Sequence, residues 1–186
     1  MKESEEDCAT DSGRVSMPAA PSPIAGSGDN AEYQRIWLAT QSRAWRTLAV
    51  VPVDEGISTF EVASLITTLG LHHGESVSVA DLRDVRLNRV GAFLEVAGEL
   101  VSRGQRVVFA TGSIKENLAT VPLARAADGV VLCVSIGATM LGSIEETIEQ
   151  IGKERFLGSI LVRGSARNAR GAAAKSTALQ ALQARS

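Results

Sequence analysis

Apolar residues recur in five short runs along the middle of the chain, and polar residues or Gly bound each run. The runs are rich in Val, which is typical of strands that are buried on both faces. They predict strands within residues 48–53, 76–80, 106–110, 129–135 and 157–162. Because helical periodicity separates the runs, we expect a three-layer α/β fold, with a mostly parallel sheet and helices on both faces. Ligands bind such sheets at the carboxyl ends of the strands.

Apolar residues at helical spacing mark the segments between the strands. In the first of these segments, Tyr33, Ile36 and Trp37 share one face. The pattern predicts helices within residues 31–43, 58–70, 88–103, 113–126 and 143–151. Gly70 and Gly104 stand where two of these helices should stop. Pro122 predicts an interruption of the helix within residues 113–126.

Three serines stand near predicted helix starts, and each precedes a glutamate by three positions. This is the capping-box pattern, in which each side chain accepts a hydrogen bond from the backbone N–H of the other residue. The pairs are Ser58–Glu61, Ser113–Glu116 and Ser143–Glu146. We therefore expect each pair to fix the first turn of a helix.

Composition divides the chain into three parts. Residues 1–30 are rich in Ser, Ala, Gly, Pro and acidic groups, with too few large apolar side chains to offset the entropy of ordering. We expect a disordered acidic tail there, a folded domain over residues 31–163, and a flexible basic tail over residues 164–186. Attraction between the tails, or between the basic tail and an anionic membrane surface, is the alternative.

The net charge and the remaining polar residues exclude several classes of site. A formal charge of −2 gives no reason to expect a nucleic-acid surface. No run reaches the ~18 apolar residues of a spanning helix, and the N-terminus lacks the apolar stretch of a signal peptide, so we expect a cytoplasmic protein. Cys8 and Cys133 form neither a metal cluster nor an evident disulfide framework. The adjacent His72 and His73 are expected to be exposed loop residues without a third metal ligand.

The polar segment between the first strand and the second helix carries the main candidate chemistry. A P-loop has Gly, four residues, and then Gly-Lys-Ser or Gly-Lys-Thr, which together cradle phosphate at a helix N-terminus. In that frame this chain keeps Gly56 and Ser58, but has Val51 for the first Gly and Ile57 for the Lys. The segment therefore fits a weakened phosphate cradle. It also fits a structural turn in which Ser58 only caps a helix.

Several segments follow one another in an order typical of one family. The first helix carries Glu32 and Arg35, residues 54–59 read Asp-Glu-Gly-Ile-Ser-Thr, and residues 79–83 read Val-Ala-Asp-Leu-Arg. Over most of the predicted domain this order resembles the bacterial tyrosine kinases of polysaccharide export. That family belongs to the deviant P-loop group, alongside partition and division-site ATPases. The resemblance implies a P-loop NTPase-like fold.

The departures from the family pattern fall on the positions that carry its chemistry. The P-loop lysine is replaced by Ile57, the first aspartate of the Asp-Ala-Asp-Leu-Arg segment by Val79, and the Walker B aspartate by Ala110. Phosphoryl transfer needs a cation on the phosphates and a metal held by carboxylates. In the family's assembly helix, Leu38 replaces the last arginine. Tyr33 is the one tyrosine, so this sequence has no tyrosine-rich tail of the kind such kinases phosphorylate.

Two functions follow from the resemblance. In the first, the chain is a catalytically degenerate, pseudokinase-like module that binds or regulates the machinery of exopolysaccharide or capsule biosynthesis and export, without a cofactor. The resemblance then implies a partner in the cytoplasmic part of a membrane polysaccharide co-polymerase, and a peripheral place at the inner membrane. It also implies homo-oligomers through Glu32 and Arg35.

In the alternative, the chain retains binding of ATP and Mg²⁺ as a protein-tyrosine kinase or ATPase of the same pathway. Gly56, Ser58 and Thr59 would then hold phosphate. Asp81 would lie near the metal or the acceptor, and Arg83 would replace the missing cation. An unrelated small-molecule enzyme on a similar sheet is a third class, but no nucleophile–base pair favours it.

Overall fold

The computed structural model describes residues 31–163, and both predicted tails lie outside the described residues. Within this range five strands form one sheet in the order β2-β3-β1-β4-β5, and every neighbouring pair is parallel. The strands are β1 (Thr47–Pro52), β2 (Val77–Asp81), β3 (Arg106–Ala110), β4 (Gly129–Ile136) and β5 (Phe156–Arg163). The predicted α/β class with a parallel sheet is confirmed.

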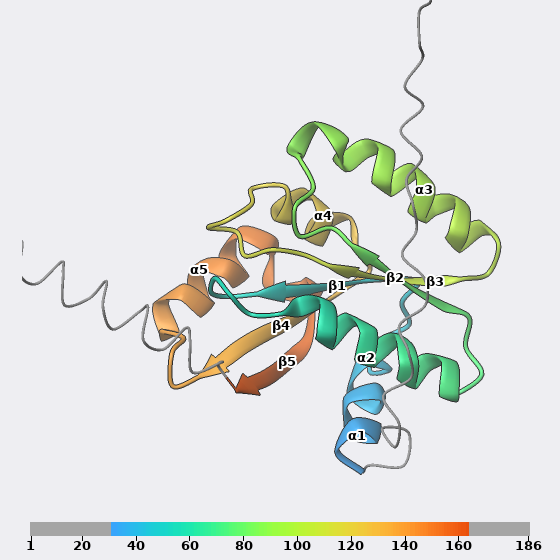
Figure 1. Cartoon of the computed structure of the whole chain (residues 1–186), viewed down its shortest axis with the longest axis horizontal. Coiled ribbons are helices and arrows are strands. Elements are labelled where there is room, and N and C mark those ends of the chain that lie inside the picture. The colour runs from blue at the N-terminus through green and yellow to red at the C-terminus, as the bar shows by residue number, and fades with distance from the viewer. Residues whose placement is uncertain (1–30, 164–186) are drawn as a thin grey trace, which may run out of the picture.

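Helices cover both faces of the sheet (Figure 1). The first two pack on one face, and the other three pack on the opposite face. Their bounds are α1 (Ala31–Thr40), α2 (Thr59–His72), α3 (Val90–Ser102), α4 (Thr120–Ala126) and α5 (Leu141–Ile151). Two 3-10 turns, Leu87–Arg89 and Lys153–Arg155, precede α3 and β5. The molecule therefore has the three predicted layers.

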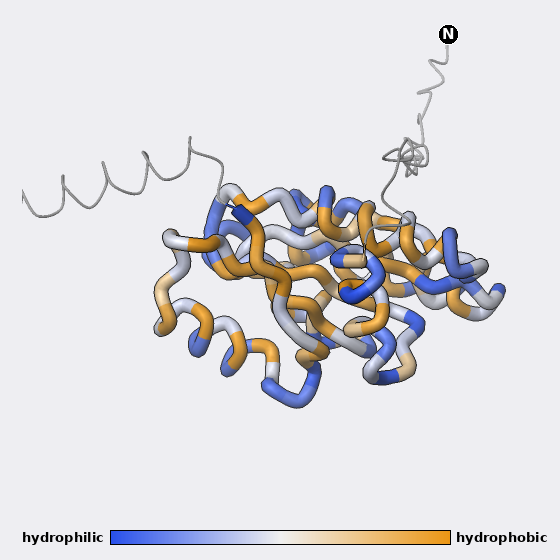
Figure 2. The backbone as a smooth tube through the Cα atoms, turned by 90° about the horizontal axis from the view of Figure 1, so that it is seen from below, coloured by the Kyte–Doolittle hydropathy of each residue, from blue (hydrophilic) through white to orange (hydrophobic). Residues whose placement is uncertain are grey.

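Alternate residues of the central strand enter two apolar cores. Leu48 and Val50 of β1 lie in the core beneath α1 and α2, whereas Ala49 and Val51 lie in the core beneath α3, α4 and α5. All four side chains are fully buried. Figure 2 shows hydrophobic stretches of the backbone running through the middle of the fold. Burial on both faces explains why this strand reads as a continuous apolar run and not as an alternating one.

Gly70 does not stop α2, contrary to the prediction from the sequence. The helix continues to His72, and a left-handed glycine follows at Gly74, with φ of 79°. A Cβ at position 70 would lie 2.6 Å from Cγ2 of Val77 and 3.0 Å from the Trp37 ring. The glycine is therefore needed where α2 passes close to β2 and α1.

Two other helix boundaries also depend on Gly and Pro. Gly104 has a φ of 82° just after α3, as expected for the end of that helix. Pro122 lies in the first turn of α4, where the missing N–H has no helical partner to lose, so it does not interrupt the helix. Residues 113–119, which were predicted to belong to this helix, form turns and irregular structure.

One of the three predicted capping boxes forms. The Glu116 N–H donates to Ser113 Oγ at 3.2 Å, and the Ser113 N–H donates to the Glu116 carboxylate at 3.2 Å. This pair closes a turn and does not start a helix. Ser58 is the N-cap of α2, but its side chain makes no cap bond. The Ser143 prediction is wrong because α5 starts earlier in the chain, with Met140 as its N-cap.

His73 and Cys133, neither of which was expected to form a site, take part in the packing of the domain. His72 and His73 are exposed, as expected, but His72 is the last residue of α2 and not a loop residue. The His73 ring also stacks on Trp37, with centroids 5.6 Å apart. Its Nε2 lies 2.8 Å from Oε1 of Gln34, so the end of α2 is tied to α1. Cys133 is buried in β4, and burial raises the pKa of its thiol to about 12.

Candidate functional site

A cavity of about 600 Å³ opens at the carboxyl ends of β1, β2 and β3. The β1–α2 loop, the segment after β2 and the segment after β3 line it. The lining residues are Gly56, Ile57, Ser58, Arg83, Asp84, Val85, Arg86, Gly112, Glu116 and Asn117. β1 and β3 are neighbours, but β1 continues into α2 on one face and β3 leads to α4 on the other. Ligands bind open α/β sheets where the connections diverge in this way.

The β1–α2 loop brings two of the predicted site residues to the cavity. Gly56 has a φ of 78°, the left-handed conformation that glycine adopts without strain, and it makes the turn. Ser58 follows at the N-terminus of α2 and lines the cavity. A helix N-terminus carries N–H groups without helical partners and a partial positive charge, so this wall is suited to an anion.

Thr59 does not reach the cavity, although it was a candidate phosphate ligand. Its side chain is fully buried, and its hydroxyl donates to the backbone oxygen of Thr111 at 2.7 Å. The Thr111 hydroxyl donates in turn to the backbone oxygen of Val50 at 3.0 Å. These two bonds join the start of α2 to the ends of β3 and β1, so Thr59 has a structural role here.

The side chain at the lysine position of the P-loop frame is apolar and half-buried. Ile57 lines the cavity and also packs against the core beneath α1 and α2. The first-glycine position is Val51, which is fully buried in the opposite core. Neither residue brings a charge to the cavity.

Asp81 and Arg83 bind one another at the end of β2. The Arg83 guanidinium donates to both carboxylate oxygens, from Nε at 2.9 Å and from Nη2 at 2.7 Å. This hydrogen bonding lowers the pKa of Asp81 and raises the pKa of Arg83. The guanidinium also lies 5.6 Å from the ring centroid of Phe60 on α2. Arg83 lines the cavity whereas Asp81 does not, so the carboxylate serves the ion pair.

The two other positions that are acidic in the family are buried among apolar residues. Val79 lies in the core on the α2 side of β2, and Ala110 is fully buried at the end of β3. Across residues 31–163, no three His, Cys, Asp or Glu side chains form a group that could hold a metal ion. Val79 and Ala110 therefore offer no carboxylate to Mg²⁺, which is usually bound through one or two carboxylates.

Asn117 organises the cavity, and the sequence offers no local signal for it. Its side-chain nitrogen donates to the backbone oxygens of Arg83 at 2.9 Å and Val85 at 2.8 Å. Its side-chain oxygen accepts the N–H of Ala119 at 3.0 Å. Asn117 therefore fixes the segment after β2 against the segment after β3. Glu116, also on the cavity wall, was visible in the sequence as half of a capping box.

Lys115 is a second residue that the sequence did not single out. Its Nζ lies 3.8 Å from Oδ1 of Asp54 in the β1–α2 loop and donates to Oγ of Ser143 at 3.1 Å. The other carboxylate oxygen of Asp54 is buried without a hydrogen-bond partner among the described residues. Lys115 is not one of the residues that line the cavity, so its charge offsets Asp54 and does not replace the P-loop lysine.

The residues expected at an oligomer interface lie together on α1. Glu32 and Arg35 are exposed, and Leu38 is 66% exposed. Arg35 also borders a cleft of about 240 Å³ between α1 and β5. Their exposure is compatible with assembly, which stays a prediction from the resemblance.

Two comparisons with known proteins find no match. No family model matches the chain, and no curated protein matches it. The likeness to the polysaccharide-export kinases therefore stays a prediction from the sequence. Among residues 31–163, no helix has both the length and the apolar character needed to cross a bilayer.

Proposed function

We propose that this chain is a P-loop-like binding or regulatory module without phosphoryl-transfer activity, which serves exopolysaccharide or capsule biosynthesis and export. The proposal depends above all on Ile57. Its side chain stands at the lysine position of the P-loop frame, lines the cavity and packs against the core beneath α2. A cavity with an apolar group at that position lacks the point charge that a P-loop sets against the β- and γ-phosphates.

The acidic positions support the same proposal. Asp81 is engaged by Arg83 at 2.7 Å, and Val79 and Ala110 offer no metal ligand. One charged hydrogen bond contributes roughly 1.5–3 kcal/mol. Loss of the lysine alone would therefore weaken phosphate binding by about one to two decades. Catalysis also needs the metal that neutralises charge in the transition state.

The partner and the cellular place of the module are proposed from the resemblance. We propose docking to the cytoplasmic part of a membrane polysaccharide co-polymerase, at the periphery of the inner membrane. Homo-oligomers would form through α1, where Glu32 and Arg35 are exposed. The net charge of −2 gives no support for a nucleic-acid partner.

Calorimetric titration of the full chain with ATP and Mg²⁺ tests the loss of nucleotide chemistry. We expect no saturable binding up to about 1 mM nucleotide, with a normal circular dichroism spectrum. Saturable micromolar binding that Ser58→Ala weakens would reject the module proposal. Affinity capture of the chain from its native cell tests the partner, and recovery of unrelated enzymes without a polysaccharide co-polymerase would count against it.

The second candidate function is residual binding of ATP and Mg²⁺, as a kinase or ATPase of the same pathway. The cavity geometry favours it, because Gly56 and Ser58 stand at the N-terminus of α2, and Arg83 and Arg86 line the same space. On this view the arginines replace the missing lysine. The titration separates the two functions, since only the second predicts saturation that Arg86→Gln weakens.

A further inference from the structure

A second cleft lies between α3 and the β2 edge of the sheet. Its volume is about 590 Å³, within the range of small-molecule sites. The walls are mainly apolar and include Leu82, Phe93, Val96, Ala97, Leu100 and Phe109. It shares with the first cavity only the segment Asp84–Arg86, and it lies under a different helix.

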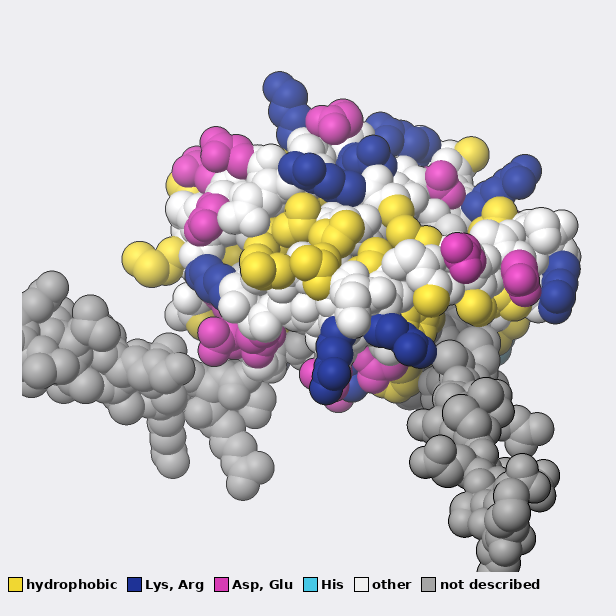
Figure 3. Space-filling view, turned by 90° about the horizontal axis from the view of Figure 1, so that it is seen from above, with side chains coloured by type: hydrophobic (Ala, Val, Ile, Leu, Met, Phe, Trp, Pro, Cys, Tyr) yellow, Lys and Arg dark blue, Asp and Glu magenta, His cyan; other side chains and the backbone are white. Residues whose placement is uncertain are grey.

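The helix above this cleft leaves part of its apolar surface exposed, although Phe93 and Leu100 also pack against the core. Only Val90 and Ala97 of α3 are buried, and Phe93 and Leu100 are partly exposed. Val96 is 43% exposed on the cleft wall. Figure 3 views the molecule from the α3 side and shows apolar side chains gathered there, with basic side chains close by. An apolar ligand in the cleft would remove this surface from water.

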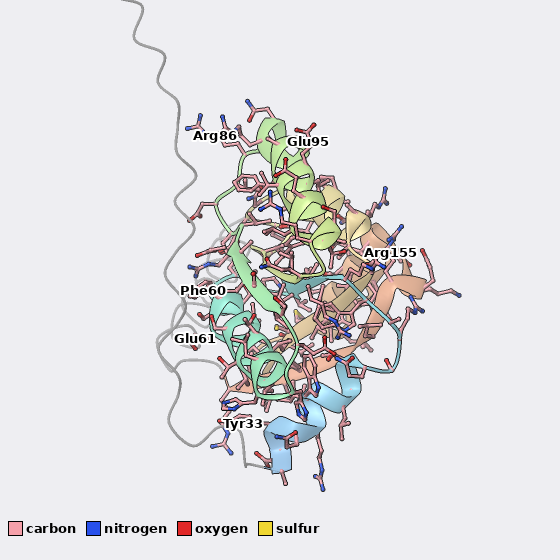
Figure 4. All side chains as sticks on the ribbon, turned by 90° about the vertical axis from the view of Figure 1, so that its right-hand side faces the viewer. Tyr33, Phe60, Glu61, Arg86, Glu95 and Arg155 are labelled. Atoms are coloured by element: carbon pink, nitrogen blue, oxygen red, sulfur yellow. The ribbon has the colours of Figure 1, made fainter. Side chains whose placement is uncertain are left out.

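One end of the cleft is positively charged. Arg86 and Arg89 line it where α3 begins, and neither side chain makes an ion pair or hydrogen bond with another described residue. Asp81, which also borders the cleft, is already paired with Arg83. Arg86 lies on the α3 side of the molecule, well separated from Phe60 on α2 (Figure 4). Asp84 is the one carboxylate of the lining without such a pair, so positive charge prevails at this end.

We propose that the cleft binds a free aliphatic carboxylate with a single unbranched chain. The chain lies along Phe93, Val96 and Leu100, and the carboxylate lies between Arg86 and Arg89. The apolar walls provide affinity through burial of methylene groups, and the arginines select an anionic head over a neutral one. This inference does not depend on the proposed function.

Displacement of the fluorescent dye 1-anilinonaphthalene-8-sulfonate from the full chain tests the proposal. In the series octanoate, decanoate, dodecanoate, affinity should rise by about fourfold per methylene until the cleft is filled, the ratio that corresponds to about 0.8 kcal/mol per buried CH₂. Dodecanol should bind more weakly than dodecanoate. Affinity independent of chain length, or no displacement by 1 mM dodecanoate, would overturn the proposal.

Two arginines that flank α3 provide a matched pair of variants. Arg89 lines the cleft before the helix, whereas Arg103 follows the helix outside the cleft. Arg89→Gln should weaken dodecanoate binding about fivefold and leave dodecanol unchanged, and Arg103→Gln should change neither. Equal effects of the two variants would contradict the assigned head-group position.

A third variant tests the apolar wall. Val96→Asp places a charge on the partly exposed wall, so it should reduce the binding of both ligands without loss of the circular dichroism signal. Unchanged binding would overturn the assignment of the cleft. Vesicles with anionic phospholipids test whether the ligand is free or part of a membrane. We expect the chain not to bind them. Binding to vesicles without binding to dodecanoate would overturn the proposal of a free ligand and indicate a membrane surface instead.

Discussion

At the scale of single residues, several polar side chains near the cavity form hydrogen bonds within the protein. Thr59 bonds to the backbone of Thr111, Asp81 bonds to Arg83, and Asn117 bonds to the segment after β2. The Thr59 and Asn117 bonds each join two segments at the carboxyl edge of the sheet, whereas the Asp81–Arg83 pair stiffens the single segment after β2. Residues that appear as site candidates in the sequence therefore act partly as supports for the loops.

Thr59→Val tests the buried bond that anchors α2. The substitution leaves the backbone oxygen of Thr111 without its 2.7 Å donor, and a buried unsatisfied group costs about 1–3 kcal/mol. We expect the free energy of unfolding in urea to fall by that amount. Thr68→Val is the control, because Thr68 bonds within its own helix to Ser64 and is only partly buried. Equal losses for the two variants would contradict a special role for Thr59.

Ile57→Lys restores the charge of a P-loop but should not restore turnover. Val79 and Ala110 still offer no ligand to a metal, and Asp81 stays paired with Arg83. We expect ATP hydrolysis by this variant to equal the background rate in a phosphate-release assay. Ile57→Leu serves as the control for folding. Measurable turnover by the lysine variant would show that the acidic positions are dispensable.

At the scale of elements, the sequence predicts strands better than helix ends. The prediction for β3 matches residues 106–110 because its polar boundaries coincide with the ends of an apolar run. The predicted end of α2 at Gly70 is wrong because the sequence alone does not distinguish a glycine that ends a helix from one that allows close packing. The contacts with Val77 and Trp37 that explain it come from other elements.

Gly70→Ala and Gly98→Ala should change stability in opposite directions. The added methyl at position 70 meets Val77 at 2.6 Å, whereas nothing lies within 4 Å of the one at position 98. We expect the first variant to lose about 1–3 kcal/mol through overpacking. The second should gain about 0.5–1 kcal/mol, because alanine is the better helix former. Urea unfolding measures both, and a stabilised Gly70→Ala protein would refute the close-packing account.

The candidate site was predictable only where its signal is local. Gly56 and Ser58 stand in a short motif between a strand and a helix, and both reach the cavity. Asn117 and Lys115 contact segments about 30 or more positions away in the chain, so no short sequence pattern predicts their roles. Thr59 fits the motif, but its burial could not be known before β3 was placed beside β1.

At the scale of the whole molecule, the amino edge of the sheet is held by Asp128. Its Oδ2 accepts the backbone N–H groups of Arg46 at 2.8 Å and Thr47 at 2.9 Å, and the Thr47 hydroxyl at 3.0 Å. Burial alone would raise the pKa of this carboxyl, but these bonds lower it below its usual value. The charged carboxylate therefore stabilises the junction between the start of β1 and the segment before β4.

The hydrogen bonds to Asp128 predict that the free energy of unfolding falls at acid pH. Because the folded pKa of Asp128 is lowered, its contribution is fully present above the unfolded value of about 3.9 and is lost as pH falls through the folded pKa. Asp128→Asn keeps an acceptor oxygen but removes the charge, so its urea midpoint should fall less steeply between pH 5 and pH 3 than that of the wild type. Asp84→Asn is the control, and an unchanged slope in Asp128→Asn would contradict the prediction.

The order of strands in the sheet also affects how the chain is made. The central strand β1 pairs with no neighbour in sequence: Thr47 meets Val107, and Leu48 meets Gly129. During translation, β1 therefore leaves the ribosome long before either partner exists, and its apolar run stays exposed until β3 and β4 follow. Such long-range parallel pairing is slow and leaves apolar segments open to aggregation, so we expect the nascent chain to fold in higher yield when a chaperone is present.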